Sequence, residues 1–418
     1  MVPVQVDAFY RNGASAIALS IVSLAVACWA ISSVILRLTG SASGAIAAAA
    51  LLLLNPNVLY LQSTPMTEPL LFATSLAGIA LTVAWIEDGG PWPVSPGLAL
   101  AAACLTRYEA WPIAATAIAL TAAVLLKRGA TISDALAATL RLALFPGLAI
   151  VLFLVNSRWT VGAWFISSGF FIPENTAALG HPSVAWDQIR EGLNHLSGTA
   201  LVWSGYAGAG LTLVAFARSR SRAPLLLLVS LAGAAALPWY AYLQGHPFRV
   251  RYDVPLVAAC AALAGAGIGL VWSRAQPIVA AAIVAMALAQ AHPLDRSAPL
   301  IVESQRDATN MTGRRAVTEY LARHYDGRSI MMSMGSLGHY MQDLSAQGFH
   351  IRDFVHEGNG DIWNFALSDP RAVVGWIAIE EKAEEGDALY LEAKRHPAFL
   401  DGFTRVADGG GVALYRHP

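Results

Sequence analysis

Apolar segments follow one another from residue 14 to residue 292, and short polar gaps separate them. A membrane-spanning helix needs roughly 20 apolar residues. The pattern therefore predicts helices at about 14–37, 42–60, 67–86, 97–106, 110–126, 138–156, 199–217, 223–243, 254–273 and 277–292. The segments 97–106 and 110–126 are short. They are predicted either as two helices whose ends are enclosed or open onto water, or as one kinked, re-entrant element.

The pattern changes from about Leu294, where charged residues become frequent and apolar residues alternate with polar ones. The pattern predicts helices that alternate with strands, and this order of elements is typical of a small α/β domain. The polar run HEGNGDIW at 356–363 fits a turn with a helix cap as well as a ligand site. Helices are predicted at 304–325, 336–347, 359–368 and 386–396, strands at 328–334, 349–355 and 371–379, and a glycine-turned hairpin at 403–416.

The composition indicates an integral membrane protein. Of the 418 residues, 56% are hydrophobic and 13% are charged, whereas a soluble protein carries about 25% charged residues. A formal net charge of −1 gives no reason to expect nucleic acid as a partner. Cys28, Cys104 and Cys260 lie in apolar segments without metal or disulfide spacing. No metal-ligand motif is evident, and the sequence leaves a divalent cation open as a cofactor.

Lys and Arg in short loops mark the cytoplasmic side of a membrane protein. The clearest such segment is ARSRSRAP at 217–224, which is predicted to lie inside together with Arg37, Lys127 and Arg128. The long loop 157–198 and the C-terminal domain then lie outside the cytoplasm. The chain is thus predicted as an outer loop remnant at 1–13, a transmembrane domain at 14–293 and an extracytoplasmic α/β domain at 294–418. The expected location is a plasma membrane of the bacterial inner-membrane type.

Charged and polar residues within the apolar region gather in three clusters on the predicted outer side. An ionisable side chain in or next to hydrocarbon is costly unless it is paired or faces water, so such clusters are candidate functional sites. The first cluster, LNPNVLYLQSTPMTEP (54–69), supplies Asn55, Tyr60, Gln62 and Glu68. Thr67 is predicted to cap a helix whose first turn holds the Glu68 carboxylate. A simple helix-start acid is the alternative interpretation.

The second cluster is TRYEAW (106–111), which supplies Arg107, Tyr108 and Glu109. Arg107 and Glu109 are interpreted either as an ion pair that fixes the packing of two helices or as ligand-binding residues. Arginine suits phosphate because its planar fork donates two parallel hydrogen bonds. Tyr108 suits the membrane interface or the face of a sugar ring.

The third cluster is QGHPFRVRYDVP (244–255), which supplies His246, Arg249, Arg251 and Tyr252. The two arginines share a face if the segment is extended, and a basic patch on lipid headgroups is the alternative. The three clusters together predict a site for an anionic lipid head at the outer mouth of a helix bundle. There a carboxylate can act as general base on an acceptor hydroxyl, and arginines can stabilise the departing phosphate.

The segments NPNVLYLQSTPMTEPL, LTRYEAWP and GHPFRVRYDVPL resemble membrane glycosyltransferases of GT-C architecture. The nearest group is the dolichyl-phosphate-mannose–protein mannosyltransferase family with its bacterial homologues. The resemblance covers most of the chain, through loose motifs. It implies a polytopic GT-C-like bundle of about ten transmembrane helices. It also implies inverting transfer of a sugar from a polyprenyl-phosphate donor, among membrane lipids, to an acceptor that the sequence does not identify. In it, Glu68 would be the second acidic residue near the reaction centre, and Arg107, Arg249 and Arg251 would be candidates for the donor phosphate.

The N-terminal segment departs from the family pattern. The resemblance implies a catalytic aspartate in the first outer loop, after a first transmembrane helix. Residues 1–13, MVPVQVDAFYRNG, instead resemble the end of such a loop, with Asp7 as their carboxylate. We therefore expect a further helix ahead of Met1 and an impaired 418-residue form; a start codon placed too far downstream and an inactive remnant are the two explanations.

Two other function classes fit the same clusters. One is a transporter or flippase of an anionic lipid-linked substrate, which predicts broken helices at the membrane midplane. The other is a non-catalytic scaffold whose C-terminal domain binds a partner.

Overall fold

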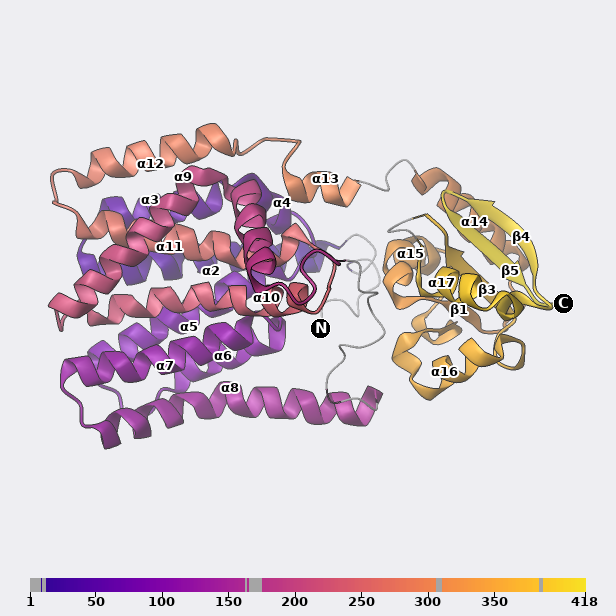
Figure 1. The fold of residues 1–418 in the computed structure, drawn as a ribbon, viewed down its shortest axis with the longest axis horizontal. Helices are drawn as coiled ribbons and strands as arrows, with labels where there is room; N and C mark the ends of the chain where they lie inside the picture. Colours follow the sequence, from indigo (N-terminus) through magenta and orange to yellow (C-terminus); the bar gives the residue numbers. More distant parts are fainter. Residues whose placement is uncertain (1–8, 10–12, 162–163, 165–174, 306–309, 383–385) are drawn as a thin grey trace. The chain divides into compact units, whose positions relative to one another are not determined.

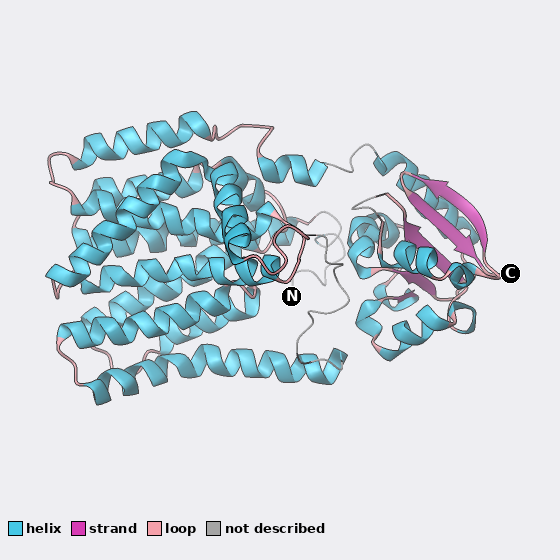
Figure 2. Ribbon diagram, viewed as in Figure 1, coloured by secondary structure: helices cyan, strands magenta, loops and turns pink. Residues whose placement is uncertain are grey.

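The computed structural model describes residues 9, 13–161, 164, 175–305, 310–382 and 386–418. Contacts divide the chain into two compact units. The first contains residues 1–153 and 172–303, and the second contains 154–171 and 304–418. The first unit is a bundle of helices (Figure 1), and the second contains a five-stranded sheet (Figure 2).

The helical unit contains seven helices that are long and apolar enough to cross a membrane, or eight if one bent pair is a single span, among the residues described. The ten spans predicted from the sequence are not confirmed, since the helices Val94–Thr106 and Gln276–Gln290 are too short to meet this criterion. Its elements are α2 (Ala14–Thr39), α3 (Ala42–Leu53), α4 (Pro56–Gln62), α5 (Glu68–Asp88), α6 (Val94–Thr106), α7 (Ala110–Arg128), α8 (Ile132–Val161), α9 (Pro182–Arg218), η2 (Ala223–Ala235), α10 (Ala236–Leu243), η3 (Val250–Asp253), α11 (Val254–Leu270), α12 (Gln276–Gln290) and α13 (Pro299–Gln305).

The predicted helix 42–60 is two helices, α3 and α4, which meet at an angle of 69°. Pro56 stands at the start of α4, where its ring fits, but it could not continue α3. Asn55 caps α4, because its side-chain oxygen accepts hydrogen bonds from the backbone N–H groups of Asn57 and Val58. The local sequence thus ends one helix and starts the next within three residues.

The prediction of a long loop at 157–198 is wrong at both of its ends, because α8 continues to Val161 and α9 begins at Pro182. The first part of α9 is amphipathic. Ala185, Ile189 and Leu193 recur at helical spacing and are buried, while many of the intervening polar residues are exposed. The apolar stripe of this part is narrow, so the apolar pattern alone did not predict a helix here.

A break inside α9 lies at Gly198, whose φ is 74° and ψ is 157°. Only glycine adopts this backbone conformation at little cost. Gln290 of α12 lies against the break, and its side-chain oxygen accepts a hydrogen bond of 2.8 Å from the backbone N–H of Ala200. The α12 side chain thereby satisfies a donor that the break leaves without a helical partner.

Helix α11 lies at the centre of the bundle (Figure 1). In the apolar part of the span Val250–Leu270, which consists of η3 and α11, 94% of the residues are buried. Its sequence, VPLVAACAALAGAGIGL, is rich in small residues, which allow helix backbones to approach closely. A Cβ atom added to Gly44 of α3 would lie 2.5 Å from the carbonyl oxygen of Gly265. On the other side, a Cβ atom at Gly208 of α9 would overlap the carbonyl group of Leu263.

The second unit has the helix–strand alternation that the sequence predicts, with every predicted strand and helix from 311 onward present. Strand β1 (Ile330–Met332) pairs parallel with β2 (Phe354–Val355) and with β3 (Trp376–Glu380). Strand β5 (Val412–Arg416) pairs antiparallel with β3 and with β4 (Thr404–Gly409), so the order in the sheet is β2-β1-β3-β5-β4. The elements are α14 (Met311–His324), β1 (Ile330–Met332), α15 (Met334–Ala346), η5 (Ile351–Asp353), β2 (Phe354–Val355), η6 (Glu357–Asn359), α16 (Asp361–Ser368), η7 (Pro370–Ala372), β3 (Trp376–Glu380), α17 (Ala388–Arg395), η9 (Pro397–Leu400), β4 (Thr404–Gly409) and β5 (Val412–Arg416).

Successive strand residues point to opposite sides of the sheet, and helices cover both of these sides. Ile330 and Met332 pack with residues of α14 and α15. Met331, which lies between them, packs with residues of α16 and α17. The polar run HEGNGDIW supplies a helix cap here, since the His356 ring nitrogen Nδ1 accepts a hydrogen bond from the backbone N–H of Gly358.

Asp387, ahead of α17, carries the clearest pH-dependent contribution to stability in this unit. Its carboxylate accepts hydrogen bonds from Ser336, from the backbone N–H of Glu380 and from that of Tyr390. Burial nevertheless raises the pKa of Asp387 to about 6, above the value of about 4 in an unfolded chain. The protonated acid therefore stabilises the folded unit fully at low pH, and this contribution is lost as the pH rises through 6.

We expect Asp387→Asn to remove this pH dependence. Relative to the unaltered protein, the variant should gain on the order of 2 kcal/mol of stability between pH 4 and pH 7.5, because asparagine cannot ionise. Hydrogen exchange of peptides covering β3 measures the difference at each pH. Asp361→Asn, at an exposed acid of α16, is the control. The prediction would be contradicted if stability changed with pH in the same way in all three proteins.

Candidate functional site

The three polar clusters of the sequence meet at one end of the helical unit. At this end α5 begins at Glu68, α6 ends at Thr106 and η3 leads into α11. The start of α2 lies at the same end, because the Ser20 hydroxyl donates a hydrogen bond of 2.9 Å to the backbone oxygen of Thr64. Segments far apart in the sequence are thereby brought together.

Glu68, Arg107, Glu109 and Arg251 form what we call the ionic cluster. Arg107 donates from Nη1 to Glu68 Oε1 at 2.9 Å and from Nη2 to Glu109 Oε1 at 2.6 Å. Arg251 donates from Nε to the same Glu68 oxygen. The cluster therefore contains two carboxylates and two guanidinium groups, and its formal charges cancel.

Burial within the ionic cluster is graded. The Glu68 side chain is fully enclosed, that of Arg107 is 13% exposed and that of Arg251 is 35% exposed. The second carboxylate oxygen of Glu68, Oε2, is also buried and has no hydrogen-bond partner among the residues described. Arg251 is thus the member most open to solvent, and Glu68 keeps one acceptor oxygen unused behind it.

The charge on Arg107 is stabilised by its neighbours. Burial lowers the pKa of the guanidinium, but the carboxylates of Glu109 and Glu68 outweigh that effect, and the pKa is raised. The predicted helix cap at Thr67 does not form, although Thr67 does precede α5. Its hydroxyl instead accepts a hydrogen bond of 3.1 Å from Arg107 Nη1.

Arg249 and Arg251 are expected from the sequence to share a face if their segment is extended. That condition is not met, because residues 250–253 form the 3-10 helix η3. Arg251 turns toward Glu68, whereas the Arg249 guanidinium lies 3.9 Å from the Glu303 carboxylate of α13. Arg249 is therefore not joined to the ionic cluster by the contacts seen here.

The aromatic members of the sequence clusters pack around this site. Tyr252 lies edge-on to His246 with ring centroids 5.4 Å apart. Tyr108 packs edge-on against Trp111 at 5.3 Å and Phe153 at 5.8 Å. The Tyr108 ring is thus engaged with its neighbours in the bundle.

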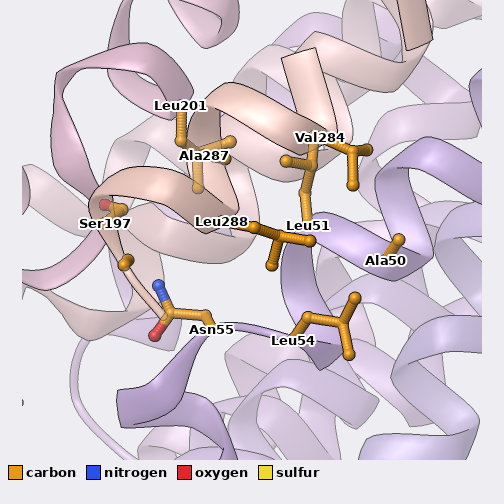
Figure 3. Close-up of a pocket in the computed structure, with 10 residues that line it drawn as sticks. Ala50, Leu51, Leu54, Asn55, Ser197, Leu201, Val284, Ala287 and Leu288 are labelled. Atoms are coloured by element: carbon orange, nitrogen blue, oxygen red, sulfur yellow. The ribbon is translucent and has the colours of Figure 1, made fainter. Parts of the chain in front are cut away.

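Asn55, Tyr60 and Gln62 do not join the ionic cluster. Asn55 caps α4, and its amide donates to the backbone oxygen of Leu196 at 2.8 Å. Tyr60 packs against the apolar core, and Gln62 ends α4. Asn55 also borders a groove between α3, α9 and α12, and apolar side chains such as Leu51, Val284 and Leu288 line most of it (Figure 3).

Asp7, the predicted catalytic carboxylate, lies outside the described residues. Among the residues that are described, no group of three or more His, Cys, Asp or Glu side chains is placed to hold a metal ion.

Asp253 belongs to the third cluster, although it is not among the candidate site residues predicted from the sequence. Its side chain is fully buried, and neither carboxylate oxygen has a hydrogen-bond partner in the described part of the chain. The available signal was an acid placed directly before the apolar run VPLVAAC.

Basic residues predicted to be cytoplasmic gather at the opposite end of the bundle. Arg37 pairs with Asp88 at 3.4 Å, and Arg128 pairs with Glu87. Glu87 and Asp88, the last two residues of α5, are thus each paired with an arginine at this end.

Comparison with known proteins adds no relative. No protein-family model, curated protein or solved structure matches the chain.

Proposed function

We propose that the chain transfers a sugar from a polyprenyl-phosphate donor to an acceptor at the extracytoplasmic face of a membrane, within a bundle of the GT-C type. The observation that carries this proposal is the bridging of a buried carboxylate, Glu68, by Arg107 and the more exposed Arg251. An anionic lipid head at the end of an apolar bundle needs a cation that is held in place and partly open to solvent.

Arg251 is the residue that we assign to the donor phosphate. It uses Nε for Glu68, which leaves its two terminal amino groups for a bidentate contact with phosphate oxygens. Arg107 is held on two sides by Glu68 and Glu109, and it fixes the carboxylate that orients Arg251. Tyr252 and His246 lie beside this position and suit the sugar ring.

The reaction needs one bond formed and one broken. The acceptor oxygen bonds to the anomeric carbon of the sugar while the bond from that carbon to the phosphate oxygen breaks. The electron pair stays on the phosphate, where Arg251 stabilises it. The acceptor proton passes to a carboxylate, and Glu68 Oε2, which accepts no hydrogen bond from a described residue, is the candidate in this part of the chain.

The test is transfer of labelled sugar by the full chain in lipid nanodiscs. The donors are polyprenyl-phosphate hexoses and pentoses, and an envelope extract supplies acceptors. We expect the amount of labelled sugar transferred from the lipid to equal the amount of polyprenyl phosphate released. Glu68→Gln and Arg251→Gln should each lower the rate by about 10²–10³-fold, the usual effect of removing one transition-state contact.

Arg37→Gln is the matched control, because Arg37 is an ion-paired arginine at the opposite end of the bundle. It should leave transfer unchanged. Full function of the double variant Glu68→Gln with Arg107→Ala would instead favour a non-catalytic scaffold.

A transporter is the second candidate, and the break between α3 and α4 is the observation that favours it, since broken helices line transport sites. The polar groups at this break are used internally, however. The Asn55 and Asn57 amides both donate to the backbone oxygen of Leu196, and Asn57 accepts from the N–H of Leu300. Movement of labelled donor into vesicles without a covalent product would support transport.

A further inference from the structure

The last residue of η3, Asp253, is a fully enclosed carboxyl group. Its relative exposure is 0%, and neither Oδ1 nor Oδ2 has a hydrogen-bond partner among the described residues. Buried polar groups in folded proteins are almost always hydrogen-bonded. An exception of this kind, at the entrance to a central helix and two residues from Arg251, calls for an explanation.

The Asp253 carboxyl is closely enclosed on the side of α9. A Cβ atom added to Gly192 of α9 would overlap Oδ2, so the carboxyl packs directly on the α9 backbone. The Phe248 ring closes the same side, with its Cζ atom 3.3 Å from that Cβ position. A bound water needs a cavity of its own and two or more polar partners, and the part of the chain that the structure describes offers no hydrogen-bond partner at this carboxyl.

Within the described ranges, no salt bridge reaches the Asp253 carboxyl. On the same segment, Arg251 turns toward Glu68 and Arg249 toward Glu303. The Tyr242 hydroxyl of α10 donates to the backbone oxygen of Arg249 and not to the carboxyl. The ionisable side chains of α9 on either side of Gly192 are exposed; they are Arg190, Glu191 and His195. The residues of α11 that follow Asp253 are apolar.

An isolated carboxylate in such surroundings would cost far more than a neutral acid. We propose that Asp253 is a proton-binding site, and that the bound proton holds η3 against α9. Loss of the proton places an unpaired charge against the α9 backbone and drives η3 away from it. Because Arg251 lies in the same turn, its contact with Glu68 is then broken. Protonation thereby sets whether the ionic cluster is assembled, and this inference does not depend on the proposed function.

Infrared spectroscopy tests the protonation directly. The experiment uses the full chain in nanodiscs with Asp387→Asn as background, because Asp387 is a second buried acid. We expect the carbonyl stretch of a protonated carboxyl at pH 7. The band should shift when aspartate is labelled with carbon-13, stay in place when glutamate is labelled, and disappear in Asp253→Asn. If the unlabelled protein shows no carbonyl band of a protonated carboxyl at pH 7, the proposal is overturned. This outcome requires no substitution at position 253.

Thiol accessibility tests the coupling to η3. Val250→Cys, at a half-buried position in η3, is made in a chain whose three native cysteines are replaced by alanine. The alkylation rate of the introduced thiol is measured at each pH in the presence and absence of Asp253→Asn. The ratio of the two rates removes the effect of pH on the ionisation of the thiol itself. We expect equal rates at pH 5 and several-fold faster labelling of the Asp253 protein at pH 9. A ratio that stays at one throughout would overturn the coupling, whatever the result of the sugar-transfer assay.

Discussion

Replacing Arg107 with methionine is expected to lower the free energy of unfolding of the helical unit by about 3–5 kcal/mol, the usual cost of removing one partner from a buried ion pair. The loss is large because two buried carboxylates lose their shared arginine. Glu68 then keeps only the more exposed Arg251, and Glu109 loses the ion pair that it makes with Arg107. Unfolding in mixed detergent and SDS micelles, followed by tryptophan fluorescence, measures the change.

Two companion variants make this prediction specific. Arg37→Met removes an arginine whose ion pair with Asp88 is mostly exposed, so its cost should stay below about 1 kcal/mol. Adding Glu68→Gln and Glu109→Gln to Arg107→Met should recover much of the lost stability, because the stranded charges are then gone. A triple variant as unstable as Arg107→Met alone would show that the side-chain packing of Arg107, and not its charge, is what matters.

Gly208→Ala is expected to destabilise the bundle by about 3 kcal/mol, at the upper end of the usual cost of overpacking. The added methyl group would overlap the backbone carbonyl of Leu263 in α11, which cannot rotate away as a side chain could. The two helices must therefore separate. The same unfolding assay measures the loss.

Gly210→Ala is the matched control, two residues further along α9. Nothing lies within 4 Å of a Cβ atom added there, and the position is exposed. Stability should be unchanged or slightly raised, because alanine favours a helix over glycine. Equal losses for the two variants would mean that helix propensity, and not the contact with α11, sets the cost.

Local pattern was sufficient for most of the elements. In the second unit, period-two alternation and turn residues gave the order of helices and strands, although the strands β1 and β2 are shorter than predicted. In the first unit, the apolar runs gave the long helices. The pattern failed where a polar segment is helical for tertiary reasons. The first part of α9 is such a case, because the packing of Ile189 and Leu193 on the bundle stabilises it.

The ionic cluster shows what sequence alone can and cannot provide. Residue type and membrane context identified Glu68, Arg107 and Arg251 as unusual, and the fold brings all three together. Which oxygen each arginine uses depends on distances that no local pattern encodes. The same holds for Arg249 and for Asp253, because the 3-10 turn of η3 decides which way each side chain points.

The near-complete enclosure of α11 has a consequence for how the protein is made. Both helices that flank it, α3 and α9, precede it in the chain and are synthesised first. When α11 leaves the insertion machinery, the faces of α3 and α9 on which it packs are already present in the membrane, and these faces form a slot lined by glycine and alanine. A chain ending before Val254 should therefore present that slot to lipid, and quality-control proteases that survey the bilayer should remove it faster than the full-length product.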